Sequence, residues 1–256
     1  MNRTRPSLAL VGLATLSAAH AQPGPSTTVF GARLETAAKL DARGNVLEVS
    51  LTLPMRAVEN APSGMNMGGP MRPDAVIAFP EVVRKTTFLN HAALFWNPLG
   101  HEPVQRNGTP HWDLHFFTVE PQEAARVDCS DLTQPDPRII PQGWLPPVPP
   151  NVPAQALCVP LMGFHSEPLS EFKAPGVFKD GLFDAVMIAG FYGTRFTFLE
   201  PMLSREKLLQ RRSFSLPVPL PVNFGRSTRY PTRFRAVYDR ATDAYRFVLS
   251  GFRTLR

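Results

Sequence analysis

Alternation of apolar and polar positions recurs along the chain, and it predicts β-strands. The segment "TTVFGARLETAAKLDARGNVLEVSLTLP" carries β-branched residues on two arms around Arg43-Gly44-Asn45, which predicts a hairpin. Two further hairpins are predicted, with turns at Tyr192-Gly193 and at Arg240-Ala241-Thr242. Shorter strands are predicted in "DAVIAFPE", "TTFLNHAALFWNP" and "HWDLHFFTV".

Helical patterns are few and short. "SREKLLQRR" predicts a helix capped by Ser204, and "EPQEAARV" predicts a helical turn with Pro121 at a tolerated early position. We find no repeat at a solenoid period and no long linker. The predicted fold is therefore mainly β, a single antiparallel β-barrel or sandwich spanning residues 23–256, with one or two short helices and a long proline-rich loop.

The first 22 residues resemble a secretory signal peptide. Arg3 and Arg5 precede an apolar run from Leu8 to Leu16, and Ala19-His20-Ala21 has the small-x-small pattern of a cleavage site. No later stretch is apolar and long enough for a transmembrane anchor. We expect an exported protein, periplasmic or extracellular, of about 235 residues, a length that suits one domain.

The formal net charge of +6 becomes +4 without Arg3 and Arg5. The remaining excess lies mostly after residue 204, on Arg-rich strands, and we interpret it as a solvated face rather than a surface for anionic envelope components. Nucleic acid is not an expected partner, because no binding motif is present. The sequence leaves the oligomeric state open.

Cys129 and Cys158 are the only cysteines. In an oxidising compartment they are expected to form a disulfide, worth about 3 kcal/mol on the chain-entropy model. The segment between them, "QPDPRIIPQGWLPPVPPNVPAQALC", is too proline-rich to pair as a central strand. We expect it to lie over the body as a lid or clamp.

The stretch "PHWDLHFF" places His111, Asp113 and His115 at every second position. On a strand these three side chains share one face, while Trp112 and Leu114 share the other. His111 and His115 are about 13 Å apart on a regular strand and can hardly share one ion. Residues two positions apart, such as His111 and Asp113, can bind the same ion. Alternatively, Asp113 is not a ligand and instead orients an imidazole by accepting a hydrogen bond from it.

Five of the six histidines fall within 75 residues, in segments rich in Pro, Gly and aromatic residues. Imidazole is the commonest metal ligand, so this clustering favours a zinc or copper site. A hydrogen-bonded core or a metal-free ligand pocket is the alternative. The candidate metal ligands are His101, His111, Asp113, His115 and His165, with His91 as a further possible ligand.

Two other segments offer candidate chemistry. Glu200, in "FTFLEPML", follows an apolar strand and could be a ligand, a general base or a carboxylate at a helix entry. Met65, Met67 and Met71 lie in a glycine-rich segment, and such thioethers can select copper(I). A glycine-rich loop with incidental methionines is the favoured interpretation of that segment.

Four blocks of the chain resemble the signatures of a secreted bacterial domain family of unknown function, the type found in a Thermus envelope-stress-regulated protein. The blocks are "LFWNPLGHEP", "PHWDLHFF", "LMGFH" and "FYGTRFTFLEPML", and the resemblance covers roughly residues 45–210. It implies a fold rich in β-strands but no established activity. The polar positions that it carries over are His101, His111, Asp113, His115, His165 and Glu200. The chain departs from the family at Trp112, at Leu114 and in its proline insertion before Cys158.

Three functions are compatible with these patterns. The first is an exported metal-binding protein without catalysis, favoured by a site closed by four protein ligands. The second is a metal-dependent enzyme, a hydrolase or an oxygenase, with three ligands and an open position. For an oxygenase, His111-x-Asp113 followed by His165 matches the order of a non-haem iron triad. The third is a metal-free barrel that binds a small molecule or a partner.

Overall fold

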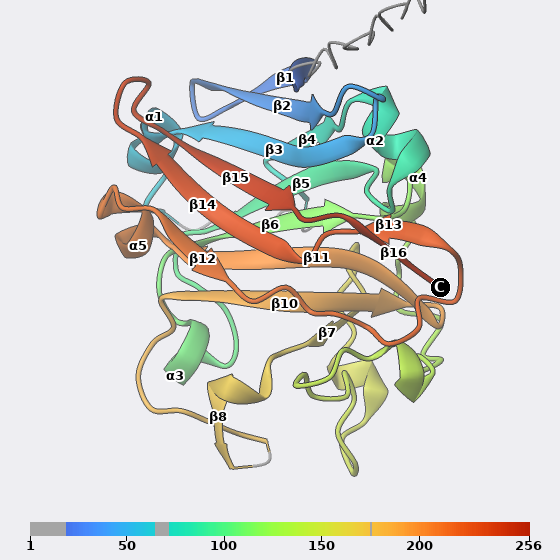
Figure 1. Cartoon of the computed structure of the whole chain (residues 1–256). Helices are drawn as coiled ribbons and strands as arrows, with labels where there is room; N and C mark the ends of the chain where they lie inside the picture. Colours follow the sequence, from blue (N-terminus) through green and yellow to red (C-terminus); the bar gives the residue numbers. More distant parts are fainter. Residues whose placement is uncertain (1–18, 65–71, 175) are drawn as a thin grey trace, which may run out of the picture.

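The computed structural model describes residues 19–64, 72–174 and 176–256, which form two six-stranded antiparallel sheets. Sheet 1 comprises, in spatial order, β1 (His20–Val29), β2 (Ala32–Leu40), β3 (Val46–Pro54), β15 (Ala244–Ser250), β14 (Arg233–Asp239) and β12 (Phe214–Leu216). Sheet 2 comprises β4 (Ala75–Ala78), β5 (His91–Asn97), β6 (His111–Phe117), β11 (Arg195–Ser204), β10 (Ala185–Tyr192) and β7 (Phe164–Ser166). The mainly β prediction is confirmed (Figure 1).

Smaller elements surround these sheets. Two-stranded sheets pair β13 (Thr228–Tyr230) with β16 (Arg253–Leu255) and β8 (Phe172–Ala174) with β9 (Val177–Phe178). The helices are α1 (Met55–Glu59), α2 (Glu81–Thr86), α3 (Val104–Asn107), α4 (Pro121–Ala124) and α5 (Arg205–Leu209). Short 3-10 turns lie at η1 (Pro137–Ile139), η2 (Ala154–Ala156) and η3 (Leu169–Glu171). No helix of the described residues is long and apolar enough to span a membrane.

The two large sheets pack face to face around one apolar core. Leu51 and Phe247 of sheet 1 and Leu114 and Leu199 of sheet 2 are all buried in it. The sheets also approach at one end, where Thr36 Oγ1 of β2 donates to the Ala78 carbonyl of the edge strand β4 at 2.9 Å. Neither sheet closes on itself within the described chain, so of the two predicted forms the sandwich applies and the closed barrel does not.

The predicted hairpins are all present, as β2–β3, β10–β11 and β14–β15. The Ser204 cap is present too, since its hydroxyl accepts from the Lys207 amide at 3.0 Å. Strand β1 was not predicted, because Pro23 and Pro25 interrupt it; an edge strand tolerates proline, and a bulge occurs there. This strand begins at His20, inside the expected leader, while residues 1–18 lie outside the described residues.

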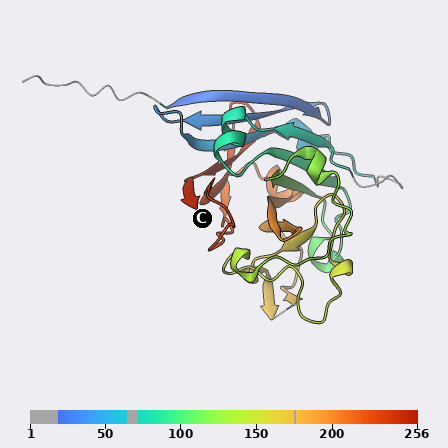
Figure 2. The same cartoon turned by 90° about the vertical axis from the view of Figure 1, so that its right-hand side faces the viewer.

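The predicted disulfide is present, with Cys129 and Cys158 bonded and their Cα atoms 5.7 Å apart. The proline-rich loop between them packs against the body. The Trp144 indole donates to the Met187 carbonyl of β10 at 3.3 Å, and the Leu145 amide donates to the Glu167 carbonyl at 2.8 Å. Figure 2 shows this loop and its neighbours gathered at the end of the molecule away from β1.

Candidate metal centre

Strand β6 is buried on both faces, and its two faces differ in chemistry. Trp112, Leu114 and Phe116 enter the apolar core between the sheets. His111 and Asp113 project from the opposite face, with His111 Nε2 3.3 Å from Asp113 Oδ1, and His115 follows at the same spacing. We call this the histidine face; the predicted alternation is confirmed.

The segments between β6 and β10 cover the histidine face. Phe183 packs edge-on against His111, with ring centroids 5.1 Å apart. Met162 packs in a separate apolar cluster with Phe95 and Phe117. His111 and His115 are both fully buried, so the three polar side chains must find partners within the protein.

The first candidate group, group A, comprises His101, His111 and Asp113. One donor atom from each lies within 4.8 Å of the other two. His101 arrives from the turn after β5, and its Nε2 lies 3.7 Å from Asp113 Oδ2. The His101 side chain is 41% exposed, so solvent reaches group A. His101, one of the predicted ligands, thus lies beside strand β6.

The group A imidazoles are both oriented by backbone carbonyls. His111 Nδ1 lies 2.7 Å from the Thr109 carbonyl, and His101 Nδ1 lies 2.8 Å from the Glu102 carbonyl. A carbonyl can only accept, so each Nδ1 carries a proton, and each Nε2 is directed at Asp113. This is the arrangement that metal-ligating histidines use. Asn97 completes it by donating from Nδ2 to Asp113 Oδ2 at 2.7 Å.

The second candidate group, group B, comprises His115, His165 and Glu200, again within 4.8 Å of one another. Glu200 Oε2 lies 3.6 Å from His115 Nε2 and 3.5 Å from His165 Nε2. His165 is on β7 and Glu200 is on β11, and β10 lies between these strands. The β10 residue opposite His165 is Gly190, and the Phe198 ring fills the space that its side chain would take. His165, one of the predicted ligands, thus lies beside His115 of strand β6.

Burial decides the protonation of group B in the metal-free protein. Burial lowers the pKa of His115 to about 3 and that of His165 to about 4, so both are neutral at pH 7. Burial, reinforced by the negative charge of Asp113, raises the pKa of Glu200 well above its ordinary value. Group B is therefore electrically neutral without a cation.

In group A, unlike group B, the carboxylate is ionised in the metal-free protein. Burial opposes ionisation of Asp113, but the adjacent His101 and His111 imidazoles outweigh it and hold the pKa of Asp113 well below the usual range. Burial likewise disfavours charge on His101, yet the nearby Asp113 carboxylate and its negative charge raise the pKa of His101. Group A thus has a carboxylate already ionised, which is the form that a metal needs.

The structure corrects the treatment of the ligands as members of one site. The five candidate residues and Glu200 divide into two groups of two imidazoles and one carboxylate. His165 lies with His115 and Glu200, so the proposed iron-oxygenase triad of His111, Asp113 and His165 is not assembled. His91 belongs to neither group: its Nδ1 lies 3.0 Å from the Val119 carbonyl, and its ring stacks on Phe117.

Sequence reasoning missed two polar residues near group A. Asn97 stands opposite His111 in the β5–β6 register and could have been found from the strand alternation of "HAALFWN". Glu167 follows His165 at the next alternate position, and burial followed by the Glu171 charge raises its pKa to about 7. Met65, Met67 and Met71 lie outside the described residues, so the copper(I) interpretation stays a prediction.

Comparison of the chain with protein-family models, with curated proteins and with solved structures found no match. The resemblance to the secreted bacterial family therefore stays a prediction.

Proposed function

We propose that the protein is an exported metal-binding protein that holds zinc or copper at groups A and B. The supporting observation is a set of unpaired polar atoms. Among the described residues, eight buried side-chain nitrogen and oxygen atoms have no hydrogen-bond partner, and five of these belong to the two groups. They are His111 Nε2, Asp113 Oδ1, both ring nitrogens of His115, and Glu200 Oε2.

Leaving such atoms unpaired costs about 1–3 kcal/mol each, so a structure retains them where a ligand satisfies them. Imidazole nitrogen with carboxylate oxygen suits Zn²⁺ and Cu²⁺. Both cysteines are in the disulfide, so the chain offers no thiolate ligand. Export is proposed from the leader-like residues 1–22 together with that disulfide.

The two ions would occupy separate positions. Both oxygens of Asp113 face group A, with Oδ1 near His111 and Oδ2 near His101 and Asn97. No oxygen of Asp113 is therefore left to bridge to group B.

Elemental analysis of the untagged protein purified from the periplasm tests the proposal. We expect about two equivalents of zinc or copper per chain, falling to about one in a His115→Ala/His165→Ala double variant. A His91→Gln variant, which leaves both groups intact, should keep two. A metal-free protein that also takes up neither ion after chelation would contradict the proposal and leave the metal-free binding protein.

A second candidate is a metal-dependent enzyme, and one observation favours it. Group A supplies three donors, one of them on the exposed His101, so a bound ion there keeps a position for water or substrate. A hydrolase of this kind should cleave p-nitrophenyl acetate or phosphate when zinc-loaded and lose that activity in His111→Ala. Hydrolysis that is absent, or unchanged in His111→Ala, would exclude this candidate for these ester classes.

A further inference from the structure

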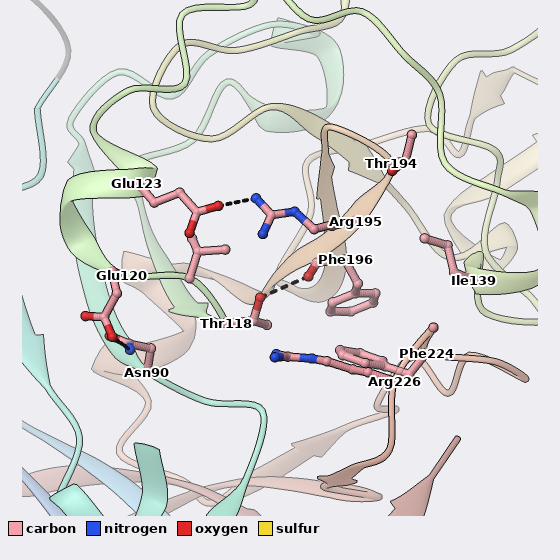
Figure 3. A pocket seen from close by; sticks show the side chains of 12 residues that line it. Asn90, Thr118, Glu120, Glu123, Ile139, Thr194, Arg195, Phe196, Phe224 and Arg226 are labelled. Atoms are coloured by element: carbon pink, nitrogen blue, oxygen red, sulfur yellow. Dashed lines mark hydrogen bonds and ion pairs between the residues drawn. The ribbon is translucent and has the colours of Figure 1, made fainter. Parts of the chain in front are cut away.

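A cavity of about 540 Å³ lies outside the two metal groups, at the other end of strand β6 from His111. Its walls come from the connection after β6, the β10–β11 turn, Ile139 of the disulfide-closed loop, and residues 224–226 (Figure 3). No residue of group A or group B lines it. Its volume falls within the range of about 300–1,000 Å³ typical of small-molecule sites.

One wall is aromatic and held in place. Phe196 and Phe224 line the cavity, with ring centroids 5.5 Å apart. Phe224 also packs edge-on against Phe88 and at a tilt against Tyr230, with ring centroids 5.6 Å apart in each pair. Three aromatic neighbours fix the Phe224 ring before any ligand arrives, which lowers the entropy cost of stacking on it.

Most charged side chains of the cavity have a polar partner, but Arg226 does not among the described residues. Glu123 forms an ion pair with Arg195, and Glu120 accepts a hydrogen bond from Asn90 at 2.7 Å. Arg226 makes no ion pair or side-chain hydrogen bond with the described residues. Its guanidinium carbon lies 6.0 Å from the Phe224 ring centroid, at the outer limit of a cation–π contact. Figure 3 shows this guanidinium directed across the cavity.

We propose that this cavity binds a small aromatic molecule with one anionic group such as a carboxylate. The guanidinium of Arg226 can donate two parallel hydrogen bonds to that carboxylate, a pairing for which its geometry is suited. The aromatic part would lie against Phe224 and Phe196. Glu120, on the opposite side, disfavours a second negative charge. The proposal does not depend on metal binding.

Calorimetric titration of the full chain with 2-naphthoate and with its neutral isostere 2-naphthamide tests this assignment. We expect naphthoate to bind about tenfold or more tightly than naphthamide. In Arg226→Gln, naphthoate affinity should fall about tenfold to the naphthamide level, while naphthamide affinity stays unchanged. Phe224→Leu should weaken both probes.

Arg235→Gln is the matched control, because Arg235 is an exposed arginine on β14 that does not line the cavity. Its affinities should equal those of the wild type. Arg226 is exposed, so its replacement leaves the fold intact, which an unchanged thermal midpoint would verify. Equal affinity for the two probes, absence of naphthoate binding at millimolar concentration, or an unaltered Arg226→Gln would each overturn the proposal.

Discussion

His115 Nε2 lies 3.6 Å from Glu200 Oε2, and neither atom has a hydrogen-bond partner among the described residues. The distance is longer than a hydrogen bond but short enough for both atoms to contact one cation. A buried acid and a buried imidazole that approach without bonding are poorly satisfied as they stand. A bound ion would satisfy both, and this relationship gives the first prediction.

Glu200→Gln should abolish the ion at group B and leave the metal-free fold intact. The pKa of Glu200 is raised, so the metal-free protein holds it as a neutral acid, which glutamine mimics in size and charge. We expect metal affinity at group B to fall at least about 100-fold. The free energy of unfolding of the metal-free protein should change by less than about 1 kcal/mol, measured by urea denaturation.

Glu35→Gln is the control for that substitution, since Glu35 is a surface carboxylate of β2 whose one ion-pair partner among the described residues is Arg33. It should change neither metal content nor stability. Retention of two ions by Glu200→Gln would remove Glu200 from the ligand set.

His101→Ala should separate metal affinity from stability at group A. The side chain is 41% exposed, so water can take its place beside Asp113, and its loss should cost less than about 1 kcal/mol of stability. It supplies one of three donors, so zinc affinity at group A should fall at least about tenfold while group B keeps its ion. Competition with a chromogenic chelator measures this. Gln105→Ala on the adjacent α3 is the matched control, and an equal loss in both variants would contradict the assignment.

Acid should destabilise the metal-free protein partly through His91. Burial lowers the pKa of His91 from 6.5 to about 4, so below pH 6.5 the unfolded chain binds a proton that the folded chain does not. The stability present above pH 6.5 is therefore lost as the pH falls toward 4. In His91→Gln, the decrease in free energy of unfolding from pH 7 to pH 4 should be smaller by about 3 kcal/mol. Urea denaturation in EDTA at a series of pH values tests this. Parallel plots of the free energy of unfolding against pH for the wild type and His91→Gln would refute it.

Gly190→Ala should disturb group B through its neighbour Phe198. A Cβ at Gly190 would lie 2.2 Å from ring atoms of Phe198, whose centroid is 4.6 Å from that of His115 and 5.2 Å from that of His165. We expect a loss of about 1–3 kcal/mol and a thermal midpoint lower by several degrees. Metal affinity should fall at group B and not at group A. Gly64→Ala, where a Cβ meets nothing within 4 Å, should leave midpoint and affinity unchanged.

The sequence was sufficient for the local features of the fold and of the site. Alternation along "PHWDLHFF" correctly assigned His111 and Asp113 to one face, and turn residues located the hairpins, because both depend on near neighbours. The division into two groups was not predictable. It depends on the packing of β7 beside β10 and on Gly190, which are long-range pairings that a residue pattern does not encode. Strand β1 was missed for the same reason, since only its edge position makes its prolines acceptable.

The two-faced burial of β6 has a consequence for how the chain reaches its native pairing. A slip of one residue against β5 or β11 would exchange the two faces of the strand. Two imidazoles and a carboxylate would then be buried in the apolar core between the sheets, and Trp112 would face the covering loops. Because β6 pairs with both neighbours, this penalty applies to both ladders at once. The residues proposed to hold metal thus also disfavour a shifted strand register. Replacing them with apolar residues would reduce the free-energy difference between the native and the shifted register, even without a bound ion.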